Sequence, residues 1–167
     1  MAKNGKTSFI SPSCGVLTPK RMIEEIRKFV ESDQSSRYRL VIGTDSQVRR
    51  LNGTPHCDYV TAIVIYRTGR GARYFWHKKK EKTPSVLREK IYTETTKSLE
   101  VAELLVPSIR EAISPVRYDL EIHIDVGPLG ETRDMIKEVT GMVIGNGYTP
   151  RTKPGSWAAS SVADRHT

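Results

Sequence analysis

The most constraining feature of the sequence is an almost wholly apolar run, YVTAIVIY, at positions 59–66. A run this short and this rich in β-branched residues predicts a strand buried on both faces, at the centre of a sheet. Strand-forming segments flank it at residues 38–44 (YRLVIGT) and 72–78 (ARYFWHK), with turn residues in between. Because short connections join antiparallel neighbours, we expect these three segments to form an antiparallel meander.

After the meander the hydrophobic pattern alternates between helical and strand periods. We expect helices at 19–31, 85–106, 130–143 and 157–165, and two further strands at 118–126 and 148–152. Strands that follow crossover helices run parallel to their neighbours in the sheet. The sequence therefore predicts an α/β fold with a five-stranded mixed sheet, in which three antiparallel strands are followed by two parallel ones. We expect one domain over residues 18–167, preceded by an N-terminal arm at 1–17.

Composition excludes several classes of protein. No apolar run approaches the roughly 18 residues of a membrane span, and the N-terminus lacks the apolar segment of a secretory signal. Two cysteines, Cys14 and Cys57, are too few for a disulfide scaffold or a four-cysteine zinc site. We therefore expect a cytoplasmic protein with no membrane partner. Lys and Arg number 27 against 19 Asp and Glu, a formal charge of +8 that favours a polyanionic partner, most often nucleic acid. The oligomeric state stays open.

Two aspartates follow predicted strands. Asp45 comes directly after the first strand, and Asp125 ends the fourth. If these strands are parallel neighbours, both carboxylates lie at the same edge of the sheet, where ligand sites of open α/β sheets are found. An alternative for Asp45, in the sequence GTDS, is that it caps a turn.

Two further carboxylates are expected on the inner faces of helices. At about 100° per residue, Glu94 falls in the apolar stripe that contains Leu87 and Ile91. A buried carboxylate needs a cation, a metal or hydrogen bonds, so the alternative for Glu94 is a partner Lys or Arg. Asp164 shares a helix face with Trp157, and the alternative there is an ordinary residue at a frayed terminus.

Carboxylates that converge on one place repel one another, and divalent cations relieve that repulsion. Oxygen ligands favour Mg²⁺ or Mn²⁺ over zinc. Two such ions can activate a water molecule and stabilise the leaving oxygen in phosphodiester cleavage. We therefore predict that the metal-binding and catalytic residues are Asp45, Glu94, Asp125 and Asp164.

A basic stretch with interleaved aromatic residues covers the third strand and its flanks. Such charges attract backbone phosphates, and the rings can stack on bases. We predict nucleic-acid contacts at Arg70, Arg73, Trp76, Lys78, Lys79 and Lys80. The alternative is a solvated edge strand whose lysines prevent aggregation.

The order of these features resembles the ribonuclease H-like superfamily. The chain is similar, over about residues 8–167, to the YkuK-type family of ribonuclease H-like proteins found in bacteria. The segments that carry this resemblance are IGTDSQV (42–48), TAIVIYRTGRGARYFW (61–76), IHIDVG (122–127) and KPGSWAASSVADRHT (153–167). The resemblance implies a five-stranded mixed sheet with helices on both faces and a two-metal nuclease site. Matched by order, its carboxylates are Asp45, Glu94, Asp125 and Asp164.

Three functional hypotheses follow. The first is a metal-dependent nuclease that hydrolyses phosphodiester bonds with Mg²⁺ or Mn²⁺. The second is a non-catalytic nucleic-acid-binding module on the same fold. The third is an ATPase or phosphotransferase, because residues 42–46 faintly resemble the first phosphate loop of actin-like proteins. Those proteins need two such domains, and this chain supplies one.

Overall fold

The computed structural model describes residues 7–156 and 158–166, without the side chains of residues 158, 159, 163 and 164. The described chain forms seven strands and four α-helices, with one 3₁₀ turn before α3. In order they are β1 (Phe9–Ser11), β2 (Gly15–Leu17), α1 (Pro19–Glu31), β3 (Tyr38–Leu51), β4 (Thr54–Arg67), β5 (Ala72–Glu81), α2 (Leu87–Ile113), β6 (Tyr118–His123), η1 (Arg133–Met135), α3 (Ile136–Gly145), β7 (Thr149–Arg151) and α4 (Ala158–His166).

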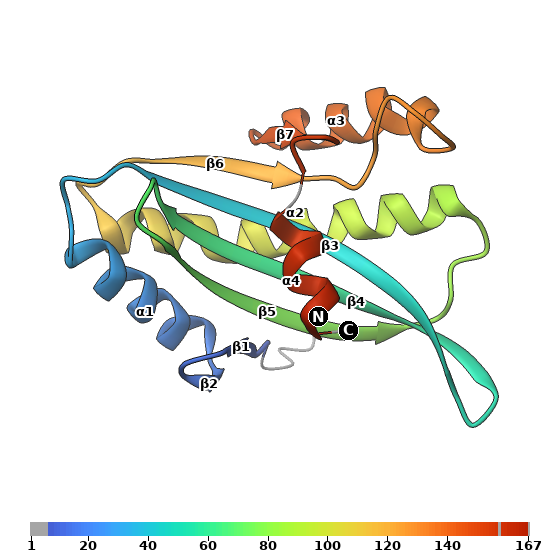
Figure 1. The fold of residues 1–167 in the computed structure, drawn as a ribbon, viewed down its shortest axis with the longest axis horizontal. Helices are drawn as coiled ribbons and strands as arrows, with labels where there is room; N and C mark the ends of the chain where they lie inside the picture. Colours follow the sequence, from blue (N-terminus) through green and yellow to red (C-terminus); the bar gives the residue numbers. More distant parts are fainter. Residues whose placement is uncertain (1–6, 157, 167) are drawn as a thin grey trace.

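The strands form one mixed sheet in the order β2-β1-β5-β4-β3-β6-β7 (Figure 1). The predicted directions are confirmed, because β3, β4 and β5 form an antiparallel meander while β6 and β7 run parallel to β3. The predicted number of five strands is wrong. The two additional strands, β1 and β2, come from the segment that we expected as an arm. Three residues each are too few to show strand periodicity, although Phe9 and Leu17 anchor them in the core.

The β3–β4 hairpin is longer than its sequence pattern suggests. Both strands continue to a two-residue turn at Asn52 and Gly53, whose φ angles of 52° and 80° suit a tight hairpin turn. Asp45 therefore lies within β3, and its predicted position at the end of a strand is wrong. Pairing between β3 and β6 reaches only Gly43, so Asp45 lies just past the end of that pairing.

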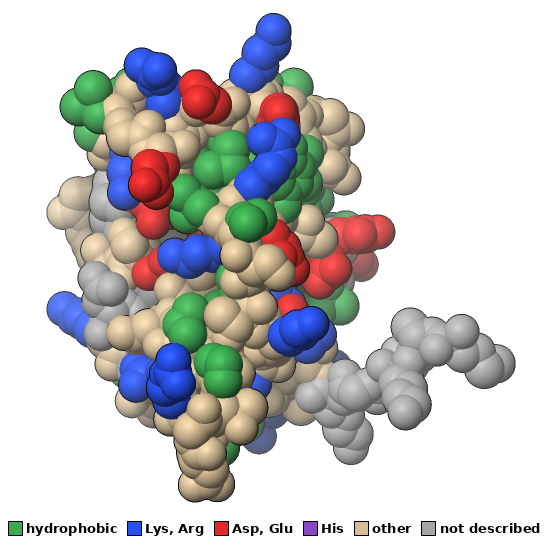
Figure 2. All heavy atoms as spheres, turned by 90° about the vertical axis from the view of Figure 1, so that its right-hand side faces the viewer, with side chains coloured by type: hydrophobic (Ala, Val, Ile, Leu, Met, Phe, Trp, Pro, Cys, Tyr) green, Lys and Arg blue, Asp and Glu red, His purple; other side chains and the backbone are tan. Residues whose placement is uncertain are grey.

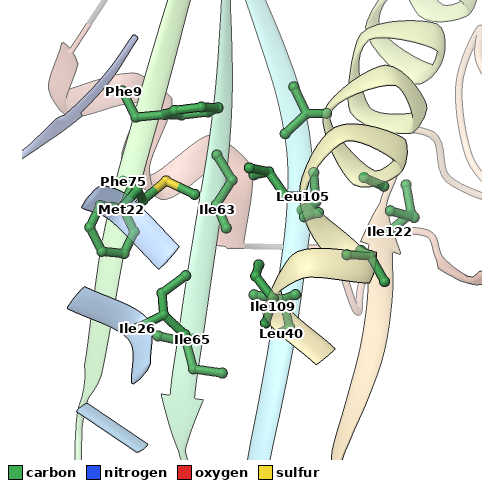
Figure 3. Close-up of a cluster of buried hydrophobic side chains, with 14 of the residues drawn as sticks. Phe9, Met22, Ile26, Leu40, Ile63, Ile65, Phe75, Leu105, Ile109 and Ile122 are labelled. Atoms are coloured by element: carbon green, nitrogen blue, oxygen red, sulfur yellow. The ribbon is translucent and has the colours of Figure 1, made fainter. Parts of the chain in front are cut away.

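Alternate residues of the central strands face two different layers. Ile42, Ile63 and Phe75 point into the main core beneath α1, α2 and α3, part of which Figure 3 shows. Val41 and Val60 point to the opposite face, where Val162 of α4 covers them. The expected helices on both faces are therefore confirmed, with three on one face and α4 alone on the other (Figure 1).

The long helix α2 provides the apolar cover of the main core. We expected it to end at 106, and the next residue is Pro107. A proline within a helix removes a hydrogen bond and costs about 3 kcal/mol. It continues to Ile113. Ile109 and Ile113 are fully or almost fully buried, so their packing offsets the cost of the proline.

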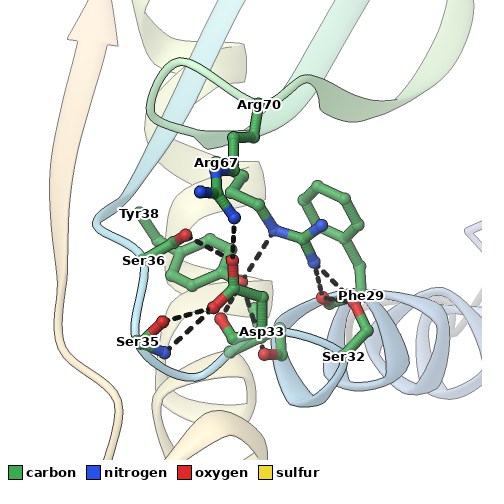
Figure 4. A network of polar contacts seen from close by, with 9 residues as sticks. Phe29, Ser32, Asp33, Ser35, Ser36, Tyr38, Arg67 and Arg70 are labelled. Atoms are coloured by element: carbon green, nitrogen blue, oxygen red, sulfur yellow. Dashed lines mark hydrogen bonds and ion pairs between the residues drawn. The ribbon is translucent and has the colours of Figure 1, made fainter.

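A polar network fastens the end of α1 to the beginning of β3 and the end of β4 (Figure 4). The Arg67 guanidinium donates to the Phe29 carbonyl and, over 3.0 Å, to the Tyr38 hydroxyl. Asp33 accepts a hydrogen bond of 2.6 Å from Ser36. Hydrogen bonds from Ser36 and its neighbouring serine lower the pKa of Asp33 to about 2.

Candidate functional site

Asp45 and Asp125 lie on the α4 face of the sheet. Asp45 is opposite Val60 in the β3–β4 register, and Val60 packs beneath α4. Asp125 follows β6, between two residues that point into the main core. Both aspartates are partly exposed and line one small pocket, together with Ser156, just before α4, and Ser160 in α4. The sheet topology thus brings together two carboxylates that are 80 residues apart in sequence.

Glu94 approaches the same region from the opposite layer. Its side chain is 4% exposed, as the helical stripe predicts, and the Ser46 hydroxyl donates to its Oε1 atom over 2.5 Å. The Lys90 ammonium is 3.9 Å from the same oxygen. Burial raises the pKa of Glu94 to about 8, against the effects of Ser46 and Lys90, and the negative charges of Asp45 and Asp125 raise it further. The three carboxylates are therefore close enough to interact electrostatically.

Lys153 is the cation of this carboxylate group. Its ammonium lies 2.7 Å from Asp125, and the hydrogen bond to Asp125 raises its pKa, with further contributions from the charges of Asp125, Asp45 and Glu94. The backbone N–H of Lys153 donates to the Val126 carbonyl over 2.7 Å. A Cβ atom on Gly127 would stand only 3.1 Å from the Lys153 Cβ, so glycine at position 127 leaves space for the Lys153 side chain.

Sequence reasoning did not single out Lys153. The available signal was its position two residues after β7, which runs parallel to β6 and ends at the same edge of the sheet.

A second charged group lies next to this pocket on the same face. Glu121 is buried, and its carboxylate contacts His123 at 3.2 Å, Arg151 at 3.0 Å and Arg39 at 3.7 Å. Burial alone would raise the pKa of Glu121, but these partners hold it below its ordinary value. Burial lowers the pKa of His123, as do the two arginines, while Glu121 acts in the opposite direction. His123 is thus a strand residue hydrogen-bonded to Glu121 on the α4 face of the sheet.

Comparison with known proteins defines the family. Residues 21–167 match the family described as Ribonuclease H-like. The chain belongs to this family. It is also 35% identical over 175 aligned residues to the uncharacterized protein YkuK of Bacillus subtilis (strain 168), covering 95% of this chain and 96% of the relative. No solved structure matches.

The family connects this ribonuclease H-like chain with nucleic acids, and members of the superfamily often use divalent metals. The donor set fits Mg²⁺ or Mn²⁺ in kind, because carboxylates from β3, α2 and the segment after β6 face one region. As placed, however, no three Asp, Glu, His or Cys side chains within the described residues lie close enough to hold a metal ion. Asp45 and Glu94 reach the region from opposite layers, and Asp125 contacts Lys153. The side chain of Asp164, like Trp157, lies outside the described part.

The predicted nucleic-acid contacts on β5 do not share one face. Trp76 and Lys78 lie on the α4 face, and so does Lys80 by strand alternation. Arg73 and Lys79 lie on the other face, where the Arg73 guanidinium stacks 4.7 Å from the Phe29 ring centre. Strand alternation thus divides a stretch that is continuous in sequence.

Three members of the predicted contact set have partners within the protein. Trp76 is only 8% exposed, because the His166 ring stacks on it with a centre-to-centre distance of 3.6 Å. Lys79 lies 3.5 Å from Glu81, and Arg70, in the turn after β4, lies 3.5 Å from Asp33. Where the sheet ends at the β3–β4 hairpin, acidic and basic side chains are mixed on the surface (Figure 2). Among the helices that the structure describes, none has the length and apolar surface that a bilayer crossing requires.

Proposed function

We propose that this chain is a metal-dependent nuclease that hydrolyses phosphodiester bonds of nucleic acid. The observation that carries the proposal is the approach of Asp45, Asp125 and Glu94 from three elements to one region. The two aspartates come close enough to raise the pKa of the buried glutamate. Two cations, Lys153 beside Asp125 and Lys90 at 3.9 Å from Glu94, face these three carboxylates, and a divalent cation would balance the remaining negative charge.

Asp45, Asp125 and Glu94 would hold Mg²⁺ or Mn²⁺, and the sequence order adds Asp164 as a fourth ligand. When bound, the metal activates water and stabilises charge on the phosphate oxygens. To hold the metal, Asp125 would give up its contact with the Lys153 ammonium. The chain's own groups prepare the site, because Ser46 fixes one oxygen of Glu94 and Glu121 fixes the ring of His123. Lys153, once released, places a positive charge beside the phosphate.

A cleavage assay with Asp45→Asn tests the proposal. The substrates are single- and double-stranded DNA, single-stranded RNA, an RNA–DNA hybrid and a four-way junction, each with Mg²⁺, Mn²⁺ or EDTA. We expect metal-dependent cleavage that falls at least about 100-fold in the variant, because the metal contributes several kcal/mol. Asp134→Asn, at an 88% exposed side chain, is the matched control and keeps full activity. Equal cleavage by Asp45→Asn and wild type would refute the nuclease.

One observation favours a second candidate, a non-catalytic nucleic-acid-binding module. The Lys153 ammonium already satisfies Asp125 within the protein, over 2.7 Å. A site kept closed in this way needs no metal to be stable. Salt-sensitive binding that EDTA leaves unchanged, without cleavage in any metal, would support this candidate.

A further inference from the structure

Four arginines follow the α4 face to the end of the sheet: Arg151 at the end of β7, Arg39 in β3, Arg37 directly before β3, and Arg70 in the turn after β4. We call them the arginine strip. We propose that the arginine strip binds the phosphate backbone of a nucleic-acid strand that extends away from the carboxylate pocket. The proposal rests on the proposed function for the identity of the ligand. It adds the path that the nucleic-acid strand takes over the protein surface.

The far end of the strip is a surface pocket of about 520 Å³. Arg37, Arg39, Arg67 and Arg70 line it, against one acidic side chain, Asp119. Arg67 is held by Phe29, Ser32 and Tyr38 and serves the fold (Figure 4). Arg70 is 73% exposed and Arg37 is also exposed, so both can turn toward a ligand.

The near end of the strip lies beside the carboxylate pocket. Arg151 is in register with His123 of β6, and His123 is in register with Gly43 of β3, two residues before Asp45. Arg39 is further back along β3, on the same face as Asp45. The strip thus begins at the carboxylate pocket and continues along β3 to the arginine-lined pocket at the end of the sheet, where Arg70 also lies 3.5 Å from Asp33.

The buried Glu121 pre-organises the middle of the strip. It contacts Arg151 at 3.0 Å and Arg39 at 3.7 Å, and the Arg39 guanidinium also stacks 5.3 Å from the Tyr66 ring centre. Each guanidinium carries five N–H donors, and a single carboxylate uses few of them. The side chains of Arg39 and Arg151 remain 39% and 55% exposed, which leaves donors for phosphate oxygens.

The dimensions of the strip favour a strand over a single phosphate group. Asp45 and Arg39 are six positions apart on β3, a distance of ~20 Å at ~3.3 Å per residue. A stacked strand rises 3.4 Å per nucleotide, so the same distance corresponds to about six nucleotides. A strand that reaches Arg39 therefore extends about six nucleotides beyond the scissile bond.

The test measures binding without metal, which separates it from cleavage. A fluorescein-labelled 12-nucleotide single-stranded DNA is titrated in EDTA and 0.1 M salt against wild type and the double variant Arg37→Gln/Arg70→Gln. The matched control is Lys20→Gln/Arg21→Gln, which removes the same charge from exposed positions of α1, on the other face. A single-strand salt slope of about 0.7 per phosphate contact gives about fivefold per contact at 0.1 M salt, so we expect about a 25-fold loss for two contacts. The control should lose less than threefold.

Length supplies a second readout. A four-nucleotide DNA is too short to span the ~20 Å from Asp45 to Arg39, so wild type should bind it more weakly than the 12-nucleotide DNA. If the double variant unfolds, Arg70→Gln alone is used, with an expected loss of about fivefold. An unchanged affinity in the strip variant, or an equal loss in the control, overturns the proposal.

The two proposals fail in different ways. Cleavage that Asp45→Asn abolishes, together with normal binding by the strip variant, would refute the strip and keep the nuclease. Binding that the strip variant loses, with no cleavage in any metal, would refute the nuclease and keep the strip.

Discussion

The two faces of the sheet are built from alternate residues of the same strands, yet they differ in almost every respect. The face beneath α1, α2 and α3 buries a continuous apolar core. The α4 face has a small apolar patch around Val41 and Val60, and charged residues surround it. The comparison teaches that one face carries the stability of the fold and the other is available for ligands.

The largest expected effect tests this division of roles on α2. Leu105→Ala should lower the free energy of unfolding by about 3 kcal/mol, because the side chain is fully buried against the sheet. Its neighbour Leu104, 48% exposed, is the matched control, and Leu104→Ala should cost less than about 1 kcal/mol. Urea unfolding measures both. Similar losses for the two variants would contradict the assignment of stability to this face.

A smaller effect is expected where α4 covers the other face. His166→Ala removes the ring stacked on Trp76 and should cost about 1 kcal/mol, in the range of aromatic pairs. In a Trp157→Phe background, iodide should also quench the fluorescence of Trp76 more strongly. Val16→Ala, at a 71% exposed position, is the control for stability. Unchanged quenching would show that α4 does not cover Trp76 in solution.

A third prediction concerns the carboxylate pocket. Lys153→Met should lower the Mn²⁺ concentration needed for half-maximal binding by about threefold, because a partly exposed ion pair contributes about 0.5–1 kcal/mol. The metal no longer has to displace the ammonium from Asp125. Lys79→Met, on the opposite face, removes an equal charge and should leave the value unchanged. Calorimetric titration measures both, and weaker binding by Lys153→Met would count against the exchange.

The smallest effect concerns the polar network at the end of α1. Because the folded pKa of Asp33 is about 2, below its ordinary value, its carboxylate stabilises the fold above about pH 4 and loses this effect as the pH falls toward 2. Asp33→Asn should therefore melt at a lower temperature than wild type at pH 7, and the difference should shrink below pH 4. Thermal melts across this range measure it. A difference that grew on acidification would contradict the prediction.

Much of the fold could be predicted, because the hydrophobic periodicity of long helices and strands shows which of their residues are buried. The helix at 19–31 and the strand directions are confirmed, and Glu94 lies buried where its helical stripe places it. The hairpin β1–β2 was missed because its strands have three residues each. The end of α2 was missed because tertiary packing outweighs the local cost of Pro107.

The candidate site was harder to predict, because it depends on which face each strand residue takes. Strand alternation separates Arg73 from Trp76, although the sequence shows one basic and aromatic run. The contacts of Glu121 with Arg39 and Arg151 join three strands, and no local pattern links residues so far apart. The alternation of apolar and polar residues at 121–125 puts Glu121 and Asp125 on one face, and this was the usable signal in the sequence.

The turn at Asn52 and Gly53 has a consequence for the dynamics of the chain. Beyond the pairing with β5, which ends at Cys57, β3 and β4 continue as a ribbon of only two strands, from Arg49 to His56. Two-stranded ribbons are marginally stable alone, so this tip should open without unfolding of the sheet. In hydrogen exchange its amides should therefore lose protection long before those of Ile63 or Leu40. The tip can thus fluctuate while the rest of β3, with Asp45, stays in place.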